Sequence, residues 1–294
     1  MQFFFALLVQ GALSGAVYAL IAQAFVVVYK ASRLANFSLG EWVTLGAALV
    51  GVGVAALGLG FGLSVLLALG GVFCLASAFN RVALRHLGGR PLITGIMLTL
   101  GLGAMMRGGM AIGLRDVPHS VPTLLPSGFW MLGGVAMPLD RIVAAAVALL
   151  AVVAAGLFYR LSRAGLALRA LADDPTAAMV SGINPDRYIT LAWALAGLYA
   201  LIAGLLWAML TGGGFGLALV GLKVFPVVVI GGLDSFEGAV LAALLVGLVE
   251  SLASGYGDPV LGSGFGALAG LMLLFGTLYL RPHGLLGTSR VERI

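Results

Sequence analysis

The sequence predicts an all-α fold: a polytopic bundle of about eight to nine transmembrane helices with an exposed, helix-containing loop in the cytoplasm. Of the 294 residues, 61% are hydrophobic and only 9% are charged, more apolar surface than a soluble core can hide. The apolar runs approach the roughly 20 residues that a helix needs to cross a bilayer. They lack the alternating pattern of outer-membrane barrel strands. We therefore expect residues 1–294 to form a single helical membrane domain.

Nine apolar segments between polar breaks are the candidate spans. The first, about 4–29, has no basic residue ahead of it and continues to Lys30, so we expect a retained span and not a cleaved signal sequence. The others lie at about 41–58, 62–80, 91–113, 140–159, 187–210, 218–233, 237–254 and 263–281. Since 218–233 is short and could be re-entrant, eight and nine crossings both remain open.

Basic residues predict the orientation of these spans. They form three clusters: Arg81, Arg85 and Arg90; Arg160, Arg163, Arg169 and Arg187; and Arg281, Arg290 and Arg293. The positive-inside bias predicts that all three face the cytoplasm. The loop 115–139, which is rich in Pro and poor in charge, should then face outward.

Glycine is abundant, with 45 residues, and two spacings are typical of closely packed helices. The pairs Gly11 with Gly15 and Gly266 with Gly270 would let neighbouring backbones approach in lipid. Four more glycines stand between two apolar segments and predict a broken helix of the kind that borders transport paths: Gly212, Gly213, Gly214 and Gly216.

The segment 160–187 is the sizeable polar stretch that carries its own helix start and stop signals. Asp174–Pro175 is a helix start, Gly182 can end that helix, and Asn184–Pro185 starts the next span. We expect a further short helix at 163–172. Two protruding cytoplasmic helices are a surface that a soluble protein can grip, although an ordinary capped loop is the alternative.

A resemblance rests on this segment and on several other stretches. Ser162, Arg163, Gly165, Arg169, Ala170, Ala172, Asp174, Gly182, Ile183 and Asn184 form a pattern that resembles the cytoplasmic loop of ABC importer permeases of the branched-chain amino acid (LivH) type. Further matches follow in family order: Tyr18–Ala22, Val28–Tyr29, Asn36–Phe37, Gly40–Glu41, Gly221–Lys223, Phe225, Val229, Gly231–Gly232 and Gly284–Gly287. The similarity spans nearly the whole chain.

The resemblance implies a multi-pass subunit in the bacterial cytoplasmic (inner) membrane. Its implied partners are a second permease subunit, in a heterodimer, two cytoplasmic ATP-binding subunits and an external solute-binding protein. The loop would couple ATP hydrolysis to transport through Arg163, Gly165, Arg169, Asp174, Gly182 and Asn184.

The residues independently require an external source of energy. A Walker A loop needs a lysine in GxxxxGK[ST], but Lys30 and Lys223 are the only lysines and neither lies in that motif. Beyond lipid and the protein partners, the sequence predicts no nucleic-acid partner, cofactor or catalytic residue. The three histidines are too scattered to predict a metal site.

Four polar residues are candidates for the translocation path. An ionisable group in mid-bilayer costs about 2.5 to 3.5 kcal/mol, so one that is kept there usually faces protein or water. Glu41 starts a span beside Asn36 and Ser38, and Lys223 lies beside the glycine break. Alternatively, Glu41 caps its span and Lys223 extends to the interface. Three others are weaker candidates: Glu250, Arg107 and Gln23.

Substrate and mechanism stay open at this stage. Leu39 replaces a histidine that the family often has, and branched-chain amino acids are only the default cargo. Urea, short amides and aromatic acids are alternatives for the same architecture. An ion-coupled secondary transporter would need buried carboxylates in several spans, which are sparse here. An integral-membrane enzyme would need a nucleophile, a base and an orienting partner, which the motifs do not supply.

Overall fold

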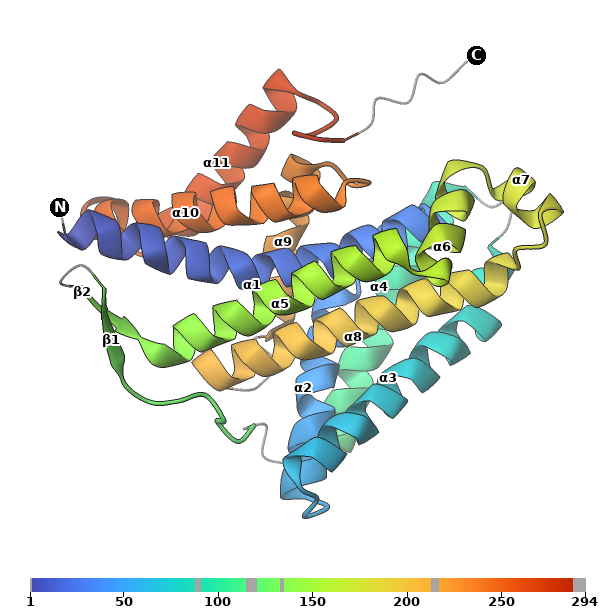
Figure 1. Ribbon diagram of the computed structural model, residues 1–294, viewed down its shortest axis with the longest axis horizontal. Coiled ribbons are helices and arrows are strands. Elements are labelled where there is room, and N and C mark those ends of the chain that lie inside the picture. Colours follow the sequence, from blue (N-terminus) through green and yellow to red (C-terminus); the bar gives the residue numbers. More distant parts are fainter. Residues whose placement is uncertain (1, 88–90, 115–120, 133–134, 213–216, 288–294) are drawn as a thin grey trace. The chain divides into compact units, whose positions relative to one another are not determined.

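The computed structural model describes residues 2–87, 91–114, 121–132, 135–212 and 217–287, and its regular structure is almost entirely helical (Figure 1). Nine apolar helices of the described residues match the predicted spans: α1 (Gln2–Ser32), α2 (Leu39–Ala55), α3 (Phe61–Val82), α4 (Leu92–Gly113), α5 (Leu139–Leu161), α8 (Pro185–Thr211), α9 (Ala218–Gly231), α10 (Phe236–Leu261) and α11 (Phe265–Leu280). Six are long and apolar enough to cross a membrane, whereas α2, α9 and α11 are shorter. The all-α polytopic fold is confirmed, and the number of crossings stays a prediction.

The remaining elements lie outside these apolar helices. Two short helices, α6 (Arg163–Asp173) and α7 (Pro175–Val180), occupy the polar segment, and a 3-10 turn, η1 (Leu84–His86), follows α3. Strands β1 (Phe129–Leu132) and β2 (Val135–Pro138) form an antiparallel hairpin, with Leu132 opposite Val135. The sequence analysis treated 115–139 only as a loop. The sequence does contain a signal for this hairpin: Gly133–Gly134 stands between two apolar runs, which is typical of a hairpin.

The chain divides into two compact units that are each assembled from separate stretches of sequence. The first unit contains residues 1–26, 125–152 and 223–294, and the second contains 27–124 and 153–222. Helices α1, α5 and α9 contribute residues to both units. The expectation of a single domain over the whole chain stays a prediction.

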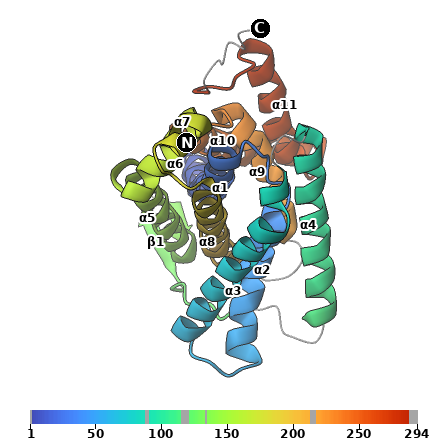
Figure 2. The same ribbon diagram turned by 90° about the vertical axis from the view of Figure 1, so that its right-hand side faces the viewer.

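In the first unit, α1 and α10 lie side by side through glycine (Figures 1 and 2). A Cβ added at Gly11 would lie 2.7 Å from the carbonyl oxygen of Gly247, and one added at Gly15 would lie 2.8 Å from that of Ala243. Ser251 Oγ donates a hydrogen bond to the carbonyl oxygen of Leu7 (2.8 Å). The predicted role of these two glycines in helix packing is therefore confirmed, because no larger side chain fits.

Helix α11 approaches α10 in the same way. A Cβ at Gly266 would lie 2.8 Å from the carbonyl oxygen of Glu250, and one at Gly270 would lie 3.1 Å from Glu250 Oε1. The chain after α11 then returns to α9, where the amide of Leu285 donates to Ile230 (2.7 Å). These contacts give the Gly284–Gly287 motif a structural role, because it pairs with the carbonyl end of α9.

In the second unit, α2, α3 and α8 pack around two tryptophans. The rings of Trp42 and Trp193 are fully buried with their centroids 6.3 Å apart, and Phe79 meets Trp193 edge-on at 4.9 Å. Asn80 Nδ2, at the end of α3, donates to the carbonyl oxygen of Asp186 (3.0 Å) and to Thr190 Oγ1 (2.6 Å). These bonds fix the end of α3 to the start of α8.

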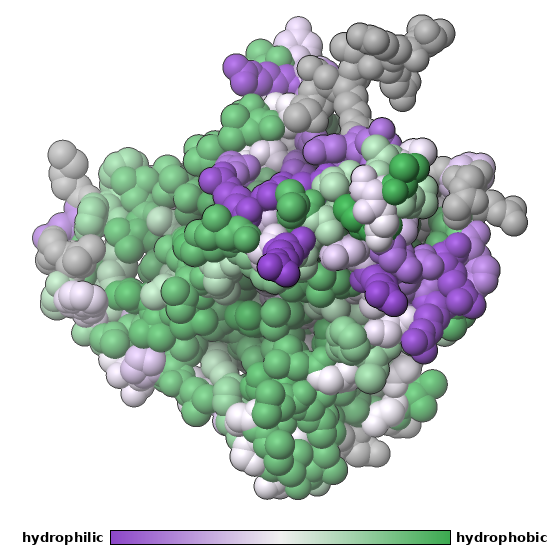
Figure 3. All heavy atoms as spheres, turned by 45° about the vertical axis from the view of Figure 1, so that its right-hand side comes forward, coloured by the Kyte–Doolittle hydropathy of each residue, from purple (hydrophilic) through white to green (hydrophobic). Residues whose placement is uncertain are grey.

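Large apolar side chains cover much of the outer surface. Hydrophobic residues dominate the face shown in Figure 3, and the hydrophilic ones gather over part of it. Exposed examples are Leu66 on α3, Leu150 on α5 and Phe275 on α11. A soluble protein rarely shows such continuous apolar surface, so lipid is the natural cover.

Candidate functional site

The two predicted polar helices form where the cap signals place them. Ser162 Oγ accepts a hydrogen bond from the amide of Gly165 (2.9 Å) at the start of α6. Asp174 Oδ1 accepts from the amides of Thr176 (2.8 Å) and Ala177 (3.0 Å) at the start of α7. Each cap pairs amides that a helix start leaves free, which is why so short a helix as α7 can form.

Gly182 ends α7 in a left-handed turn. Its φ is +84°, its amide donates to Met179 (3.0 Å), and the amide of Ile183 donates to Ala178 (3.0 Å). This pair of bonds is a Schellman motif, and it requires a residue that tolerates positive φ. Asn184 Oδ1 then accepts from the amide of Arg187 (3.4 Å) and starts α8.

Gly165 is buried and Arg169 is half-buried, and both contact the end of α5. A Cβ at Gly165 would lie 2.7 Å from the carbonyl oxygen of Phe158, so α6 can approach the end of α5 only through glycine. Arg169 Nη1 donates to the carbonyl oxygens of Tyr159 and Arg160, both at 2.9 Å. These bonds pair carbonyls that the end of α5 leaves free and join α6 to α5.

Arg33 holds the other end of α6. Its Nη2 donates to the carbonyl oxygen of Ala172 (2.7 Å) from just beyond the end of α1. The ammonium group of Lys30 lies 5.5 Å from the ring centre of Tyr159. Hydrogen bonds thus join α6 to the ends of α1 and α5, so a displacement of α6 would move these two long helices as well.

Several exposed side chains of α6 and α7 are apolar. Leu166 is 60% exposed, Met179 51% and Val180 87%, and Arg163 is exposed at the start of α6. Exposed apolar residues on short, rigid helices are typical of a surface that docks in a groove of another protein.

Asn36 and Ser38 shape the turn that starts α2. Both side chains are buried, and Ser38 Oγ donates to Asn36 Oδ1 (2.6 Å) while accepting from Trp42 Nε1 (3.1 Å). Thr99 Oγ1, on α4, donates to the carbonyl oxygen of Ala35 (3.2 Å). Consequently α2 begins beside the middle of α4 and not beside its end.

Glu41 forms an ion pair with Arg107. Glu41 Oε1 accepts from Arg107 Nε (2.9 Å) and from Arg107 Nη2. The Glu41 side chain is 6% exposed and that of Arg107 is 62% exposed. Within the described residues, Glu41 Oε2 is buried without a hydrogen-bond partner and the carboxylate caps no helix. Arg107 is only a weaker candidate on the sequence, where nothing indicates that it pairs with Glu41.

The ion pair lies in a cavity of about 570 Å³ within the second unit. This volume is within the roughly 300 to 1,000 Å³ of small-molecule sites. Apart from the two charges, the lining is small or apolar and comes from α2, α4 and the start of α9, with Phe37, Leu100 and Leu222 among its members. The cavity can hold a small molecule with both polar and apolar parts.

Lys223 and Glu250 belong to the first unit and are not among the residues that line this cavity. Glu250 Oε2 accepts a hydrogen bond from the hydroxyl of Tyr18 (2.9 Å). Of the predicted glycine break, Gly212 ends α8 with φ +85°. Gly213, Gly214 and Gly216 lie outside the described residues.

The chain is similar to known proteins of one family. The model of the family described as "Branched-chain amino acid transport system / permease component" matches residues 7–280. The chain is 30% identical to the high-affinity branched-chain amino acid transport system permease protein BraD of Pseudomonas aeruginosa, covering 98% of this chain and 97% of that protein. It is 31% identical to LivH of Escherichia coli K12, covering 97% and 96% respectively. PsaBC from Streptococcus pneumoniae, solved in complex with Fab, is 16% identical over 94% of this chain and 92% of that one, with a TM-score of 0.46.

Proposed function

Because this chain belongs to the family of permease components of branched-chain amino acid transport systems, we propose that it is the membrane-spanning subunit of an ATP-binding cassette importer for branched-chain amino acids. The observation that carries the proposal is the family match over residues 7–280. The chain is a multi-pass inner-membrane permease. It does not catalyse ATP hydrolysis, which separate subunits carry out. Its partners are ATP-binding subunits and a solute-binding protein. We further propose that this chain forms a heterodimer with a second permease subunit and that the heterodimer binds two ATP-binding subunits.

We propose that residues 160–187 form the coupling segment. Support comes from the exposed apolar face of α6 and α7, together with Arg163, which an ATP-binding subunit could contact. Gly165 and Arg169 would pass the resulting movement to α5. Asp174, Gly182 and Asn184 would keep the shape of α7 and its connection to α8.

We further propose that the cavity of Glu41 and Arg107 lines the translocation path. An amino acid carries an ammonium and a carboxylate group, and the cavity offers one side chain of the opposite charge to each. Glu41 Oε2 is available to the ammonium group and the exposed Arg107 guanidinium to the carboxylate. The apolar lining suits an aliphatic side chain. Asn36 and Ser38 would hold Glu41 in place, and Lys223 is proposed as a separate residue of the path in the first unit.

The ion pair also favours one substrate class over the alternatives. Urea and short amides carry no net charge, so they could form a charge-assisted pair with neither Glu41 Oε2 nor the Arg107 guanidinium. Aromatic acids lack the ammonium group unless they are amino acids. Branched-chain amino acids satisfy both charges and the apolar lining.

The direct test is uptake by proteoliposomes that contain the permease, its ATP-binding subunits and its binding protein. We expect uptake of labelled leucine only with ATP, and competition by isoleucine and valine but not by urea or acetamide. An ATP-binding subunit without its P-loop lysine is the control and should give no uptake. Uptake driven by an ion gradient with that control subunit would contradict the proposal and favour a secondary transporter.

A further inference from the structure

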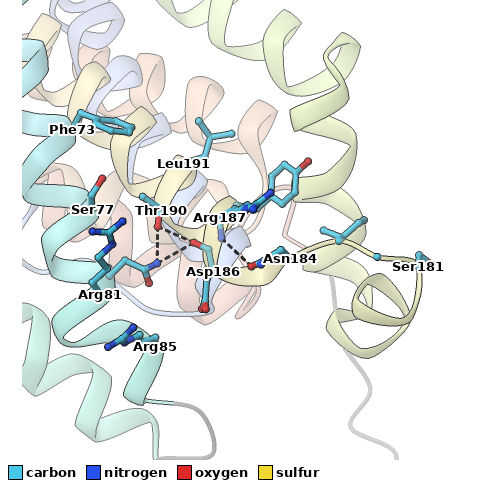
Figure 4. A pocket seen from close by; sticks show the side chains of 14 residues that line it. Phe73, Ser77, Arg81, Arg85, Ser181, Asn184, Asp186, Arg187, Thr190 and Leu191 are labelled. Atoms are coloured by element: carbon cyan, nitrogen blue, oxygen red, sulfur yellow. Dashed lines mark hydrogen bonds between the residues drawn. The ribbon is translucent and has the colours of Figure 1, made fainter.

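A cavity of about 800 Å³ lies between the end of α3 and the start of α8, entirely within the second unit. Figure 4 shows side chains of α3 along one side and the start of α8, with the turn after α7, along the other. This cavity is separate from that of Glu41 and Arg107, with which it shares no lining residue. Gly182 and Asn184 of the coupling segment contribute to its lining, but Arg81, Arg85 and Arg187 have no role in the proposed transport mechanism.

The cavity has an excess of positive charge. Arg81, Arg85 and Arg187 line it, against the single carboxylate of Asp186. All three arginines are exposed, and within the described part of the chain none of their guanidinium groups makes a hydrogen bond or ion pair. Guanidinium groups that line one hollow suit an anion with several oxygen atoms, above all a phosphate group, which such groups bind through paired N–H donors.

The far end of the same cavity is apolar. Phe73 and Leu191 lie at one end in Figure 4, and Arg85 lies toward the other. Eight residues of helix, or about 12 Å, separate Phe73 from Arg81. Phe73 is 55% exposed, and α3 is among the least buried of the candidate spans, so this end opens beside lipid-facing surface. An anionic end and an apolar end at this separation match a phospholipid better than an acidic protein segment.

One buried polar atom adds detail about the headgroup. Asn80 lines the cavity with a 4% exposed side chain, and its Nδ2 is used by Asp186 and Thr190. Its Oδ1 accepts no hydrogen bond from the described residues. A headgroup with a hydroxyl donor, such as glycerol, would satisfy this acceptor, since a buried oxygen without a partner is costly.

We infer that this cavity binds one anionic phospholipid of the cytoplasmic leaflet, of the phosphatidylglycerol type. The phosphate group lies among Arg81, Arg85 and Arg187, the headgroup hydroxyls face Asn80, and an acyl chain lies along Phe73 and Leu191. The basic cluster places the site on the cytoplasmic side, where arginines attract anionic lipid.

The test measures lipid bound to the purified transporter by native mass spectrometry after exchange into mixed vesicles of phosphatidylethanolamine and phosphatidylglycerol. The wild type should retain phosphatidylglycerol in preference to phosphatidylethanolamine. Each arginine removed should weaken retention roughly fivefold, so R81Q/R85Q should weaken it about 25-fold. R141Q removes an arginine outside the cavity and should retain lipid like the wild type. D186N removes the opposing carboxylate and should increase retention, which a folding defect could not imitate.

Three results would overturn the inference. Equal retention in R81Q/R85Q and R141Q would show that the lipid binds elsewhere. Displacement of phosphatidylglycerol by inorganic phosphate, with phosphate alone protecting the arginines from modification by a dicarbonyl reagent, would show a free-anion site. Loss of ATP-binding subunits from R81Q/R85Q, with unchanged lipid retention, would show a protein-docking site instead.

Discussion

Replacing Gly182 perturbs the coupling segment through its backbone alone. Nothing lies within 4 Å of a Cβ added there, so substitution creates no clash, and the cost comes from the φ of +84°. An alanine in this left-handed conformation costs about 1–2 kcal/mol, which lowers the ratio of native to distorted turn about 5- to 30-fold. Valine costs more, because its branched side chain tolerates positive φ least. Since α7 has only six residues, it cannot persist without its caps.

The assay is substrate-stimulated ATP hydrolysis in proteoliposomes, normalised to the amount of permease in the membrane. We expect G182V to abolish stimulation and G182A to reduce it. The matched control is G182N, which should keep most of the stimulation because asparagine accepts left-handed geometry. Full stimulation in G182V, with normal membrane levels, would refute the argument that the shape of α7 carries the coupling.

Three further predictions concern other parts of the structure. R169E removes the hydrogen bonds to Tyr159 and Arg160 and places a carboxylate beside carbonyl oxygens. Substrate-stimulated ATP turnover should therefore disappear, while immunoblots still find the chain in the membrane. Normal turnover would contradict a role for these bonds in coupling. E41Q removes a charged partner worth about 1.5–3 kcal/mol, so leucine uptake should lose about 10- to 100-fold in kcat/KM, and unchanged uptake kinetics would exclude Glu41 from the path. G15L forces α1 away from Ala243 on α10 and should destabilise the protein by about 1–3 kcal/mol or more, seen as a lower Tm in detergent. G156L, at a site with nothing within 4 Å of an added Cβ, is its control and should leave Tm nearly unchanged.

The sequence could predict those features that local chemistry decides. Asp174–Pro175, Gly182 and Asn184–Pro185 mark helix ends through caps within a few residues, and the structure places α7 and α8 at those marks. Apolar length likewise predicted the nine apolar helices of the described chain, because bilayer thickness sets helix length. The Gly11 and Gly15 spacing identified a packing face correctly, although not its partner α10.

Features that depend on tertiary contacts were not predictable in the same way. Glu41 and Arg107 are 66 positions apart, and nothing local to either residue indicates the other. The coupling role of Arg169 stays a prediction, and nothing local to this residue indicates that its side chain donates to carbonyl oxygens at the end of α5. The role of Lys223 in the path stays a prediction, because Lys223 is not among the residues that line the cavity of Glu41 and Arg107.

Site-directed cross-linking in a C74S background measures whether the α6–α7 segment contacts an ATP-binding subunit in the cytoplasm. V180C places a thiol on an exposed residue of α7, and W130C places one on the hairpin strand β1, which is predicted to face outward. The account predicts that a thiol cross-linker joins V180C, and not W130C, to an ATP-binding subunit that carries cysteines in its permease-facing groove. Labelling of V180C by an impermeant maleimide added outside intact cells, with no cross-link to that subunit, would contradict it.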